Sequence, residues 1–544
     1  MRDSPSSSSS SFWRSIARSS STWVVVVVLV PLLVVSFVAF RFDSSSSTSW
    51  LSSSSSTSSS SSSSSNNIND SSSFVSSIRG EEEHENFHMD IVLEKEGGEH
   101  AKSALQNSSL DDQVSRVLMS PSASPSPAPE NSGFSESSEA KVSHSKPKSV
   151  KRRDIKLERV ELGLSRARAA IQEATRVPSF KSSIEDKDYV PQGPIYRNAY
   201  AFHRSYLEME KLFRIYVYEE GEAPLFHDGP CKNIYSMEGR FIYAMEMGSK
   251  LRTKDPDRAH VFFLPFSVVE MVKFLYQPNT YDLRPLKRTI VDYINVVGGK
   301  YPYWNRSLGA DHFMLSCHDW GPLASAASSY LYSNSIRVLC NANASEGFNP
   351  SKDVSLPEIN LKTGVTTGLI GGPSPSRRPF LAFFAGGVHG YIRSILVKQW
   401  QGKDEDVQVH QYLPKGVSYY DMMRKSKYCL CPSGYEVASP RIVEAVYLEC
   451  VPVIISDNYV LPFSDVLNWK AFSVQIEVKD IPNIKKILSS ISPRQYIRMQ
   501  RRVKMVQRHF VINESPQRFD VFHMILHSIW LRRLNVRIQG SDYS

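Results

Sequence analysis

Two side chains with complementary chemistry, Arg441 and Glu444, lie three residues apart in a stretch that reads as strand, glycine loop, helix and strand. At that spacing they share one face of a helix. An arginine near a helix N-terminus suits a phosphate, and a carboxylate one turn later suits a ribose diol. An intrahelical ion pair on a solvated face is the competing interpretation, and the two stand at parity.

The residues around this pair predict the elements that position it. Residues 428–431 form a short apolar run that turn residues end at Gly434. Ser439 is expected as the N-cap of a helix that ends near Glu449. Residues 451–455 are an uninterrupted β-branched run, as expected for a strand buried on both faces. Such a unit is parallel, and its loop lies where open α/β sheets bind ligands.

A second unit of the same kind precedes the first. An apolar strand at 380–385 runs into Gly386 and Gly387, and a helix follows at 391–400 with Arg393 in its first turn. A glycine loop alone is a weak signal, because glycine also closes ordinary turns. Two such units in one lobe, however, suit a sheet that binds a nucleotide.

The N-terminal third of the chain has a different composition from the rest. Residues 44–65 are nearly all serine, and serine- and proline-rich sequence recurs to about residue 150. Such sequence cannot bury enough apolar area to offset the entropy of ordering, so residues 41–194 are expected to be a mostly disordered stem. The formal charge of +9 is modest for 544 residues and does not argue for nucleic acid.

Residues 23–40 are an apolar run of the length that spans a bilayer. Arg41 and Phe42 follow where a cleaved signal peptide would carry small residues, so an uncleaved anchor is favoured. Arg14 and Arg18 then favour a cytoplasmic tail at residues 1–22 by the positive-inside rule. Everything after the anchor would be lumenal.

Within the stem, residues 151–174 carry apolar positions at nearly helical spacing among many charges. They predict a helix, either a short coiled coil that pairs chains or an exposed stem helix. A second charged helix, 492–510, carries six basic residues; its default interpretation is a solvated face, and the alternative is a surface for an acidic polymer.

Lumenal placement agrees with two further features. All six cysteines lie in the globular part, which is compatible either with disulfides or with buried free thiols. Five sequons mark candidate N-glycosylation sites, at Asn69, Asn107, Asn305, Asn343 and Asn513.

Six segments together resemble one family. They are Asp255-Pro-Asp-Arg-Ala-His-Val-Phe-Phe-Leu-Pro265, Gly309-Ala-Asp-His-Phe313, Leu381-Ala-Phe-Phe-Ala-Gly386, Ser439-Pro-Arg-Ile-Val-Glu-Ala445, Val451-Pro-Val-Ile-Ile455 and Leu461-Pro-Phe463. In this order they resemble the exostosin-type glycosyltransferases of family 47, in particular the plant branch. The anchor and serine-rich stem also look like the type II Golgi membrane proteins of that family.

The resemblance implies an α/β fold of the GT-B type, with two Rossmann-like lobes facing a cleft. Residues 195–375 would form the acceptor-side lobe, and residues 376–544 the lobe that binds a UDP-sugar. It also implies inverting transfer without a bound metal, so no cofactor is expected. Asp255-Pro-Asp257 matches D-x-D but precedes its strand, where a metal ligand would not face the nucleotide.

Inverting transfer needs a base for the acceptor hydroxyl and positive groups for the leaving diphosphate. Arg441, Arg393 and the helix end at Ser439, with the loops of Gly386 and Gly434, are predicted to bind the diphosphate, and Glu444 the ribose. The preferred base is Asp311. The alternatives, His312, His318 and Asp319, bracket the same short strand. His227 is predicted to contact the acceptor.

The leading hypothesis is therefore a Golgi glycosyltransferase that moves a sugar from a UDP-sugar to a pectin or hemicellulose of the plant cell wall. A non-catalytic scaffold subunit of a Golgi synthase complex, and a membrane-tethered lectin, are the alternatives. The predicted stem helix would serve homo- or hetero-oligomerisation. UDP binding separates an enzyme from a lectin, and donor hydrolysis separates it from a scaffold.

Overall fold

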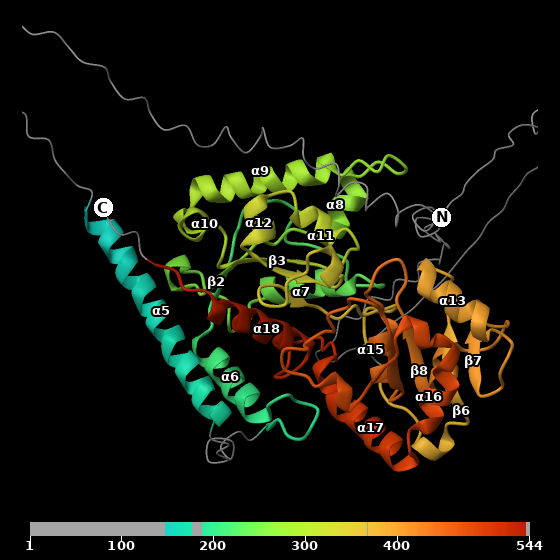
Figure 1. Ribbon diagram of the computed structural model, residues 1–544. Coiled ribbons are helices and arrows are strands. Elements are labelled where there is room, and N and C mark those ends of the chain that lie inside the picture. The colour runs from blue at the N-terminus through green and yellow to red at the C-terminus, as the bar shows by residue number, and fades with distance from the viewer. Residues whose placement is uncertain (1–146, 177–187, 367, 540–544) are drawn as a thin grey trace, which may run out of the picture. The chain divides into compact units, whose positions relative to one another are not determined.

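The structure is a computed structural model that describes residues 147–176, 188–366 and 368–539 (Figure 1). All of them belong to the compact unit Glu85–Ser544. The predicted tail, anchor and first part of the stem lie outside the described residues, as do Asn69 and Asn107. Among the residues that are described, no helix is long and apolar enough to cross a membrane.

Five parallel strands in the order β1-β2-β3-β4-β5 form the sheet of the N-terminal lobe. They are β1 (Ile215–Val217), β2 (Val261–Phe263), β3 (His312–Ser316), β4 (Ile336–Leu339) and β5 (Val354–Ser355). Every strand residue is buried, and alternate side chains enter different cores: Phe263 packs on one side and Phe262 on the other. Because the strands are parallel, their carboxyl ends meet at one edge of the sheet.

Short helices surround this sheet, and several begin at a capping side chain. Ser267 accepts a hydrogen bond from the backbone N–H of Glu270, and Ser328 accepts one from Leu331. The helices of this lobe are α6 (Ala199–Leu212), α7 (Ser236–Glu246), η4 (Pro256–Arg258), α8 (Val268–Leu275), α9 (Arg284–Lys300), α10 (Pro302–Ser307), α11 (Gly321–Ser325), α12 (Ser329–Ser333) and η5 (Ala344–Glu346).

A second parallel sheet, in the order β10-β9-β8-β6-β7, forms the C-terminal lobe. Its strands are β6 (Phe380–Ala385), β7 (Val407–His410), β8 (Ser426–Pro432), β9 (Val451–Ile455) and β10 (Val474–Gln475). The strands predicted at 380–385 and 451–455 are confirmed. Two parallel five-stranded sheets are consistent with the two lobes of a GT-B fold.

The helices of the C-terminal lobe are η6 (Pro375–Arg377), α13 (Gly390–Trp400), α14 (Tyr419–Arg424), α15 (Arg441–Tyr447), η7 (Trp469–Ala471), η8 (Val478–Asn483), α16 (Ile484–Ser490), α17 (Pro493–Val506), η9 (Gln507–His509) and α18 (Val521–Asn535). The expectation of Ser439 as N-cap of α15 is wrong: Pro440 holds that position, and no side chain caps the helix. The helix also ends earlier than predicted, and Glu449 lies beyond it in the left-handed region with φ of 55°.

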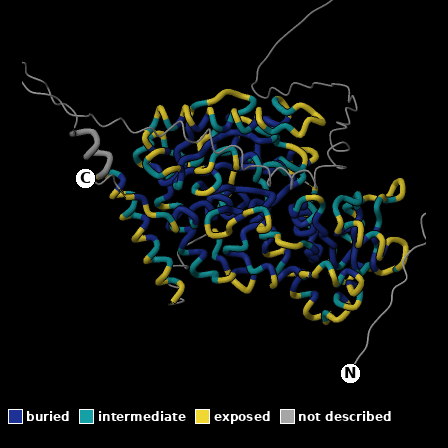
Figure 2. The backbone as a smooth tube through the Cα atoms, turned by 45° about the horizontal axis from the view of Figure 1, so that its top comes forward, coloured by how far each residue is buried: buried dark blue, intermediate teal, exposed yellow. Residues whose placement is uncertain are grey.

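The last helix, α18, packs on the N-terminal lobe although it ends the described chain (Figure 1). It contacts β4, β5 and α6, and Arg533 donates to the carbonyl of His260 at 2.7 Å. One hydrophobic core therefore runs from the inner face of the first sheet through α18 into the second lobe. Figure 2 shows buried residues in the middle of both lobes, with exposed ones on loops and outer helices.

The helix predicted at 151–174 is confirmed as α5 (Pro147–Arg176), but it is not an exposed stem helix. It packs beside α6, and Leu164 and Ala167 are buried in the core that includes α6 and α18. Ile155 and Leu162 remain exposed. The apolar face of α5, which had suggested a coiled coil with a second chain, thus packs against the core of its own chain.

Two disulfides join neighbouring elements. Cys317–Cys340 links the carboxyl ends of β3 and β4, and Cys429 of β8 pairs with Cys450 at the start of β9. Cys231 and Cys431 are free thiols. The expectation of disulfides is thus confirmed for four of the six cysteines. That of a buried free thiol is confirmed for Cys431, whereas Cys231 is free but only half-buried.

Candidate functional site

The two glycine loops of the C-terminal lobe pack against each other at the carboxyl ends of β6 and β8. A Cβ added to Gly386 would lie 2.7 Å from Nη2 of Arg441, and one added to Gly434 would lie 3.1 Å from Nη2 of Arg393. Each arginine therefore lies over the glycine of the other strand–loop–helix unit. Gly390, with φ of 73°, leaves room for the carbonyl of Gly434. The structure thus brings together both predicted arginines and both predicted glycines.

Arg441, the first residue of α15, is held on three sides. Its Nη2 donates to the carbonyl of Ala385 at 2.9 Å, and its Nε donates to the hydroxyl of Tyr419 at 3.1 Å. The guanidinium stacks on Phe384 at 4.7 Å from the ring centroid. Burial alone would lower the pKa of Arg441, but Tyr419 and the nearby Glu444 outweigh it and raise the pKa. Arg441 is therefore a permanent, oriented cation.

Glu444 is buried one turn further along α15, and two tyrosines of α14 donate to it. The hydroxyl of Tyr419 lies 2.9 Å from Oε2, and that of Tyr420 lies 3.3 Å from Oε1. Burial raises the pKa of Glu444, while Arg441 and the two hydroxyls oppose that shift. Each carboxylate oxygen keeps acceptor capacity for a further hydroxyl group, as binding of a ribose diol requires.

The predicted alternative, an ion pair between Arg441 and Glu444 on a solvated helix face, does not form in the part of the chain that the structure describes, and Glu444 is buried. Arg441 and Glu444 are instead joined through one hydroxyl, because Tyr419 accepts from Arg441 and donates to Glu444. Sequence reasoning missed Tyr419 and Tyr420. The signal that could have found them is their position on a short helix directly before β8, in the lobe that carries the pair.

The loops after β6 and β8, which carry Gly386 and Gly434, are called the donor loops below. A hydrogen bond joins the second of them, the loop between β8 and α15, to the N-terminal lobe. Asn341 follows β4, and its Nδ2 lies 2.5 Å from Oε2 of Glu436 in the loop before α15. The same amide reaches the carbonyl of Asp319 at 3.4 Å. The loops after β3 and β4 therefore meet the donor loop at the carboxyl ends of both sheets.

Of the predicted bases, His318 and Asp319 lie at this junction. Nδ1 of His318 accepts the backbone N–H of Trp320 at 3.0 Å, and burial lowers the pKa of His318 to about 4. The neutral ring then carries its proton on Nε2 and can donate but not accept there. Asp319 is partly buried after β3 and keeps its place among the candidates.

Asp311 and His312 lie at the other end of β3, away from the donor loops. Asp311 accepts from Arg306 at 2.8 Å, from Ser307 at 2.6 Å and from Nδ1 of His312 at 2.9 Å. Burial would raise the pKa of Asp311, but His312 and Arg306 hold it far below its usual range. Nε2 of His312 is occupied by the hydroxyl of Tyr218 at 2.8 Å. The structure does not bring these two residues to the junction, and we do not propose either as the base.

His227 follows β1 and is held at both ring nitrogens. Nδ1 lies 2.8 Å from Glu246, and Nε2 lies 3.1 Å from the carbonyl of Glu220. The hydrogen bond to Glu246 raises the pKa of His227. Contact with an acceptor stays a prediction for this residue.

Sequence reasoning missed several buried carboxylates of the N-terminal lobe, and two of them, Glu238 and Glu358, differ sharply in their hydrogen bonds. Glu238 of α7 is fully buried and accepts four hydrogen bonds, from Ser267, Ser316 and the backbone of Val269 and Cys317. It ties α7 to the end of β3. The other, Glu358 beyond β5, is 6% exposed and accepts none from the described residues.

The D-x-D segment serves the packing of α5. Asp255 caps η4, and Asp257 binds Lys156 of α5 at 2.9 Å and the hydroxyl of Tyr303 at 2.6 Å. Within the described ranges, no group of three or more His, Cys, Asp or Glu side chains is arranged to hold a metal ion.

Three predicted glycosylation sites fall on described residues. Asn305 is exposed, Asn513 is half-buried, and Asn343 is largely buried with its amide nitrogen on Glu346 at 2.9 Å. Glycosylation stays a prediction at all of them.

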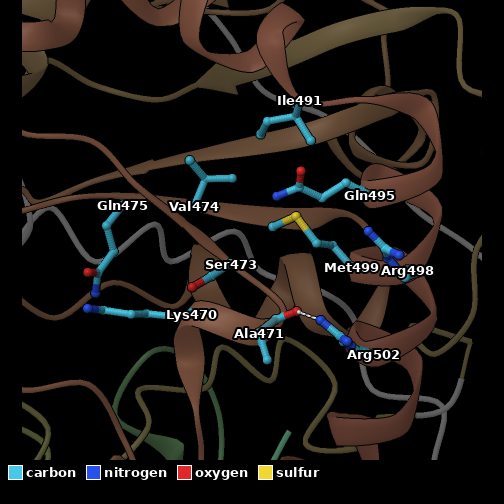
Figure 3. A pocket seen from close by; sticks show the side chains of 10 residues that line it. All are labelled: Lys470, Ala471, Ser473, Val474, Gln475, Ile491, Gln495, Arg498, Met499 and Arg502. Carbon is cyan, nitrogen blue, oxygen red and sulfur yellow. Dashed lines mark hydrogen bonds between the residues drawn. The ribbon is translucent and has the colours of Figure 1, made fainter. Parts of the chain in front are cut away.

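A basic cavity of about 440 Å³ lies apart from the glycine loops, between β10 and α17 (Figure 3). Lys470, Arg498 and Arg502 line it, and no carboxylate does. Arg502 donates to the carbonyl of Ala471 at 3.1 Å. Arg498 and Arg502, two of the six basic residues predicted on helix 492–510, therefore line a cavity.

The site belongs to a region with a known family pattern. Residues 209–491, more than half of the chain, match the exostosin GT47 domain. The chain belongs to the exostosin GT47 family. The match includes β3, both glycine loops and α15, so the resemblance predicted from the six segments is confirmed.

Relatives agree with this membership. The chain is 66% identical over 383 residues to the probable glycosyltransferase At5g03795 of Arabidopsis thaliana, covering 70% of this chain and 73% of that protein. It is 28% identical over 342 residues to the probable β-1,4-xylosyltransferase IRX10L of the same plant, covering 58% and 80%. The same identity and coverage relate it to the probable glucuronosyltransferase Os01g0926700 of Oryza sativa subsp. japonica. Membership of GT47 thus places this chain among the glycosyltransferases.

Proposed function

We propose that this GT47 protein transfers a sugar, with inversion, from a UDP-sugar to a pectin or hemicellulose of the cell wall. One observation carries the proposal. At the carboxyl ends of β6 and β8, the guanidinium of Arg441 lies over Gly386 and that of Arg393 lies over Gly434. Two cations converge where open α/β sheets bind nucleotides, with Glu444 buried behind them. The xylosyl- and glucuronosyltransferase names of the distant relatives support a wall polysaccharide as acceptor.

Each residue has a chemical role in this proposal. Arg441 and Arg393 stabilise the charge that develops on the leaving diphosphate, and their fixed orientation makes that stabilisation effective in the transition state. Glu444, oriented by Tyr419 and Tyr420, accepts hydrogen bonds from the ribose hydroxyls. The N-terminal lobe then presents the acceptor hydroxyl to the opposite face of the donor sugar.

We further propose that the protein is a single-pass type II membrane protein of the Golgi, with the GT47 domain lumenal. The apolar run at 23–40 after two arginines supports an anchor with a cytoplasmic tail. Two disulfides suit an oxidising lumen.

Replacing Arg441 tests the donor site. The full-length chain in detergent would be titrated with UDP by calorimetry and assayed for UDP release from UDP-xylose, UDP-glucuronic acid, UDP-galactose and UDP-arabinose, with xylan and pectin oligosaccharides as acceptors. Loss of charged hydrogen bonds worth about 1.5–3 kcal/mol should weaken UDP binding by roughly 10- to 150-fold in Arg441→Ala. Arg498→Ala removes a guanidinium from the cavity of Figure 3 and serves as the matched control, with unchanged affinity.

The same titration separates the competing functions. A wild-type chain that binds acceptor oligosaccharides but not UDP would be a lectin. One that binds UDP without transferring or hydrolysing any donor would be a scaffold subunit. Unchanged UDP affinity in Arg441→Ala would remove the phosphate role of that residue.

A further inference from the structure

Glu358 lies at the carboxyl edge of the N-terminal sheet, level with Asp319. Ser316 of β3 pairs with Leu339 of β4, which pairs with Ser355 of β5. Asp319 and Glu358 each lie three residues past this line, beyond the ends of β3 and β5, the two strands that flank β4. Both carboxylates therefore extend beyond the sheet at the end that faces the donor loops.

The backbone on either side of Glu358 is pinned to both lobes. Before it, the hydroxyl of Ser355 donates to the carbonyl of Val460 in the C-terminal lobe at 2.6 Å. After it, the carbonyl of Ile359 accepts from Ser236 of α7 at 2.6 Å. The segment then brings Lys362 to 5.8 Å from the ring centroid of Tyr420, the residue whose hydroxyl binds Glu444. The chain around Glu358 thus runs from one lobe to the donor site of the other.

The carboxylate of Glu358 has no hydrogen bond or ion pair with any residue that the structure describes, although its side chain is only 6% exposed. Burying an ionisable group without a hydrogen-bond or ion-pair partner is unfavourable, so buried carboxylates are normally paired. Glu238, buried in the same lobe, accepts four hydrogen bonds. The missing partners of Glu358 therefore point to a ligand that supplies them.

The charges around Glu358 belong to the donor site. Burial raises the pKa of Glu358, and Asp319, Glu444 and Glu436 raise it further, whereas Arg393 lowers it. A carboxyl whose pKa is shifted upward is a stronger base than an exposed one, which suits proton abstraction near neutral pH. Burial raises the pKa of Tyr459, and Glu358 raises it further.

We propose that Glu358 is the general base that removes the proton from the acceptor hydroxyl during sugar transfer. This inference rests on the proposed function. The proton passes from the acceptor oxygen to a carboxylate oxygen of Glu358. The freed electron pair forms the bond to the anomeric carbon. The bond from that carbon to the diphosphate oxygen breaks, and its electron pair leaves with UDP. Asp319, on the same edge, lies where it can orient the acceptor.

Glu358→Gln tests the assignment, because it keeps the size of the side chain and removes the basic oxygen. The full-length chain in detergent would be assayed with the donor and acceptor that the wild type uses best. We expect kcat to fall by roughly 10²- to 10⁴-fold, the contribution of general base catalysis. UDP affinity should stay within error, and the melting temperature should not fall, since the substitution removes a buried charge. Glu208→Gln, equally buried but paired to Arg204 at 2.8 Å on α6, is the matched control with unchanged kcat.

The pH profile distinguishes a base from a residue that merely shapes the site. The wild-type kcat/KM should rise with pH as Glu358 ionises, and Glu358→Gln should lose that rise. A Glu358→Gln enzyme with wild-type kcat would overturn the assignment while leaving the proposed function intact. So would one whose kcat/KM rises with pH in the same way as that of the wild type. A wild-type chain that releases UDP from none of the donors would overturn the proposed function itself, and the base with it.

Discussion

Two buried carboxylates at opposite edges of one sheet, Asp311 and Glu358, differ in almost every respect except burial. Asp311 accepts from Arg306, Ser307 and His312, and its pKa is lowered. Glu358 has no such partners among the described residues, and burial raises its pKa. The first carboxylate is satisfied by its own lobe and stabilises it. The second is positioned at the donor loops with its acceptor capacity unused, as a reacting group must be.

Removing the satisfied carboxylate should have the largest effect on stability. Asp311→Ala leaves Arg306 partly buried without its partner, and breaking a buried ion pair in this way costs about 3–5 kcal/mol. Unfolding by urea, followed by tryptophan fluorescence, should show a midpoint far below that of the wild type. Asp311, Arg306, Ser307 and His312 form a cluster at the amino end of β3, the amino-end cluster. A midpoint within error of the wild type would mean that this cluster contributes nothing to the fold.

The same comparison predicts opposite effects of pH on stability. The pKa of Glu358 is raised in the folded state, so its contribution to stability is full below the unfolded value of about 4.3 and is lost as pH rises. The pKa of Asp311 is lowered, so its contribution is present above about 3.9 and is lost as pH falls. The two carboxylates therefore respond to acid in opposite directions.

Glu358→Gln should therefore become more stable than the wild type as pH rises from 4 to 8. Asp311→Asn should be less stable than the wild type throughout that range, with a deficit that shrinks only in stronger acid. Urea midpoints at four pH values would measure both differences. Parallel curves for the two variants would contradict the contrast between a satisfied and an unsatisfied carboxylate.

The smallest effect is expected at the edge of the amino-end cluster. Tyr218→Phe removes one hydroxyl that donates to Nε2 of His312 at 2.8 Å. The loss of a single buried hydrogen bond should cost about 1 kcal/mol of unfolding free energy. UDP release should be unchanged, since the cluster does not take part in transfer, and a decrease in kcat per folded molecule would place His312 back among the catalytic candidates.

Much of the donor lobe was predictable from sequence because local patterns coincide with its geometry. The β-branched run of β9 and the apolar run of β6 were placed to the residue. The three-residue spacing of Arg441 and Glu444 puts them on one turn of α15. The crossing of Arg441 over Gly386 was not predictable, because it depends on how two units pack side by side.

The acceptor side was harder to predict for two physical reasons. Asp311 precedes its strand, as Asp255 and Asp257 precede theirs, so the criterion that excluded a metal at the D-x-D segment also applies to Asp311. Glu358 follows a strand of two residues, too short to give a periodic pattern. The packing of α18 on the first lobe was equally hidden, because a helix that is buried on most sides does not show which lobe covers it.

The most direct test compares the rate of transfer per UDP-binding molecule in Glu358→Gln and Asp311→Asn. We predict that Glu358→Gln loses at least about 10²-fold in kcat while binding UDP normally. Asp311→Asn should yield fewer folded molecules, each of which transfers sugar at the wild-type rate. The opposite pattern, a slow Asp311→Asn enzyme and a fast Glu358→Gln enzyme, would contradict the assignment of the two carboxylates.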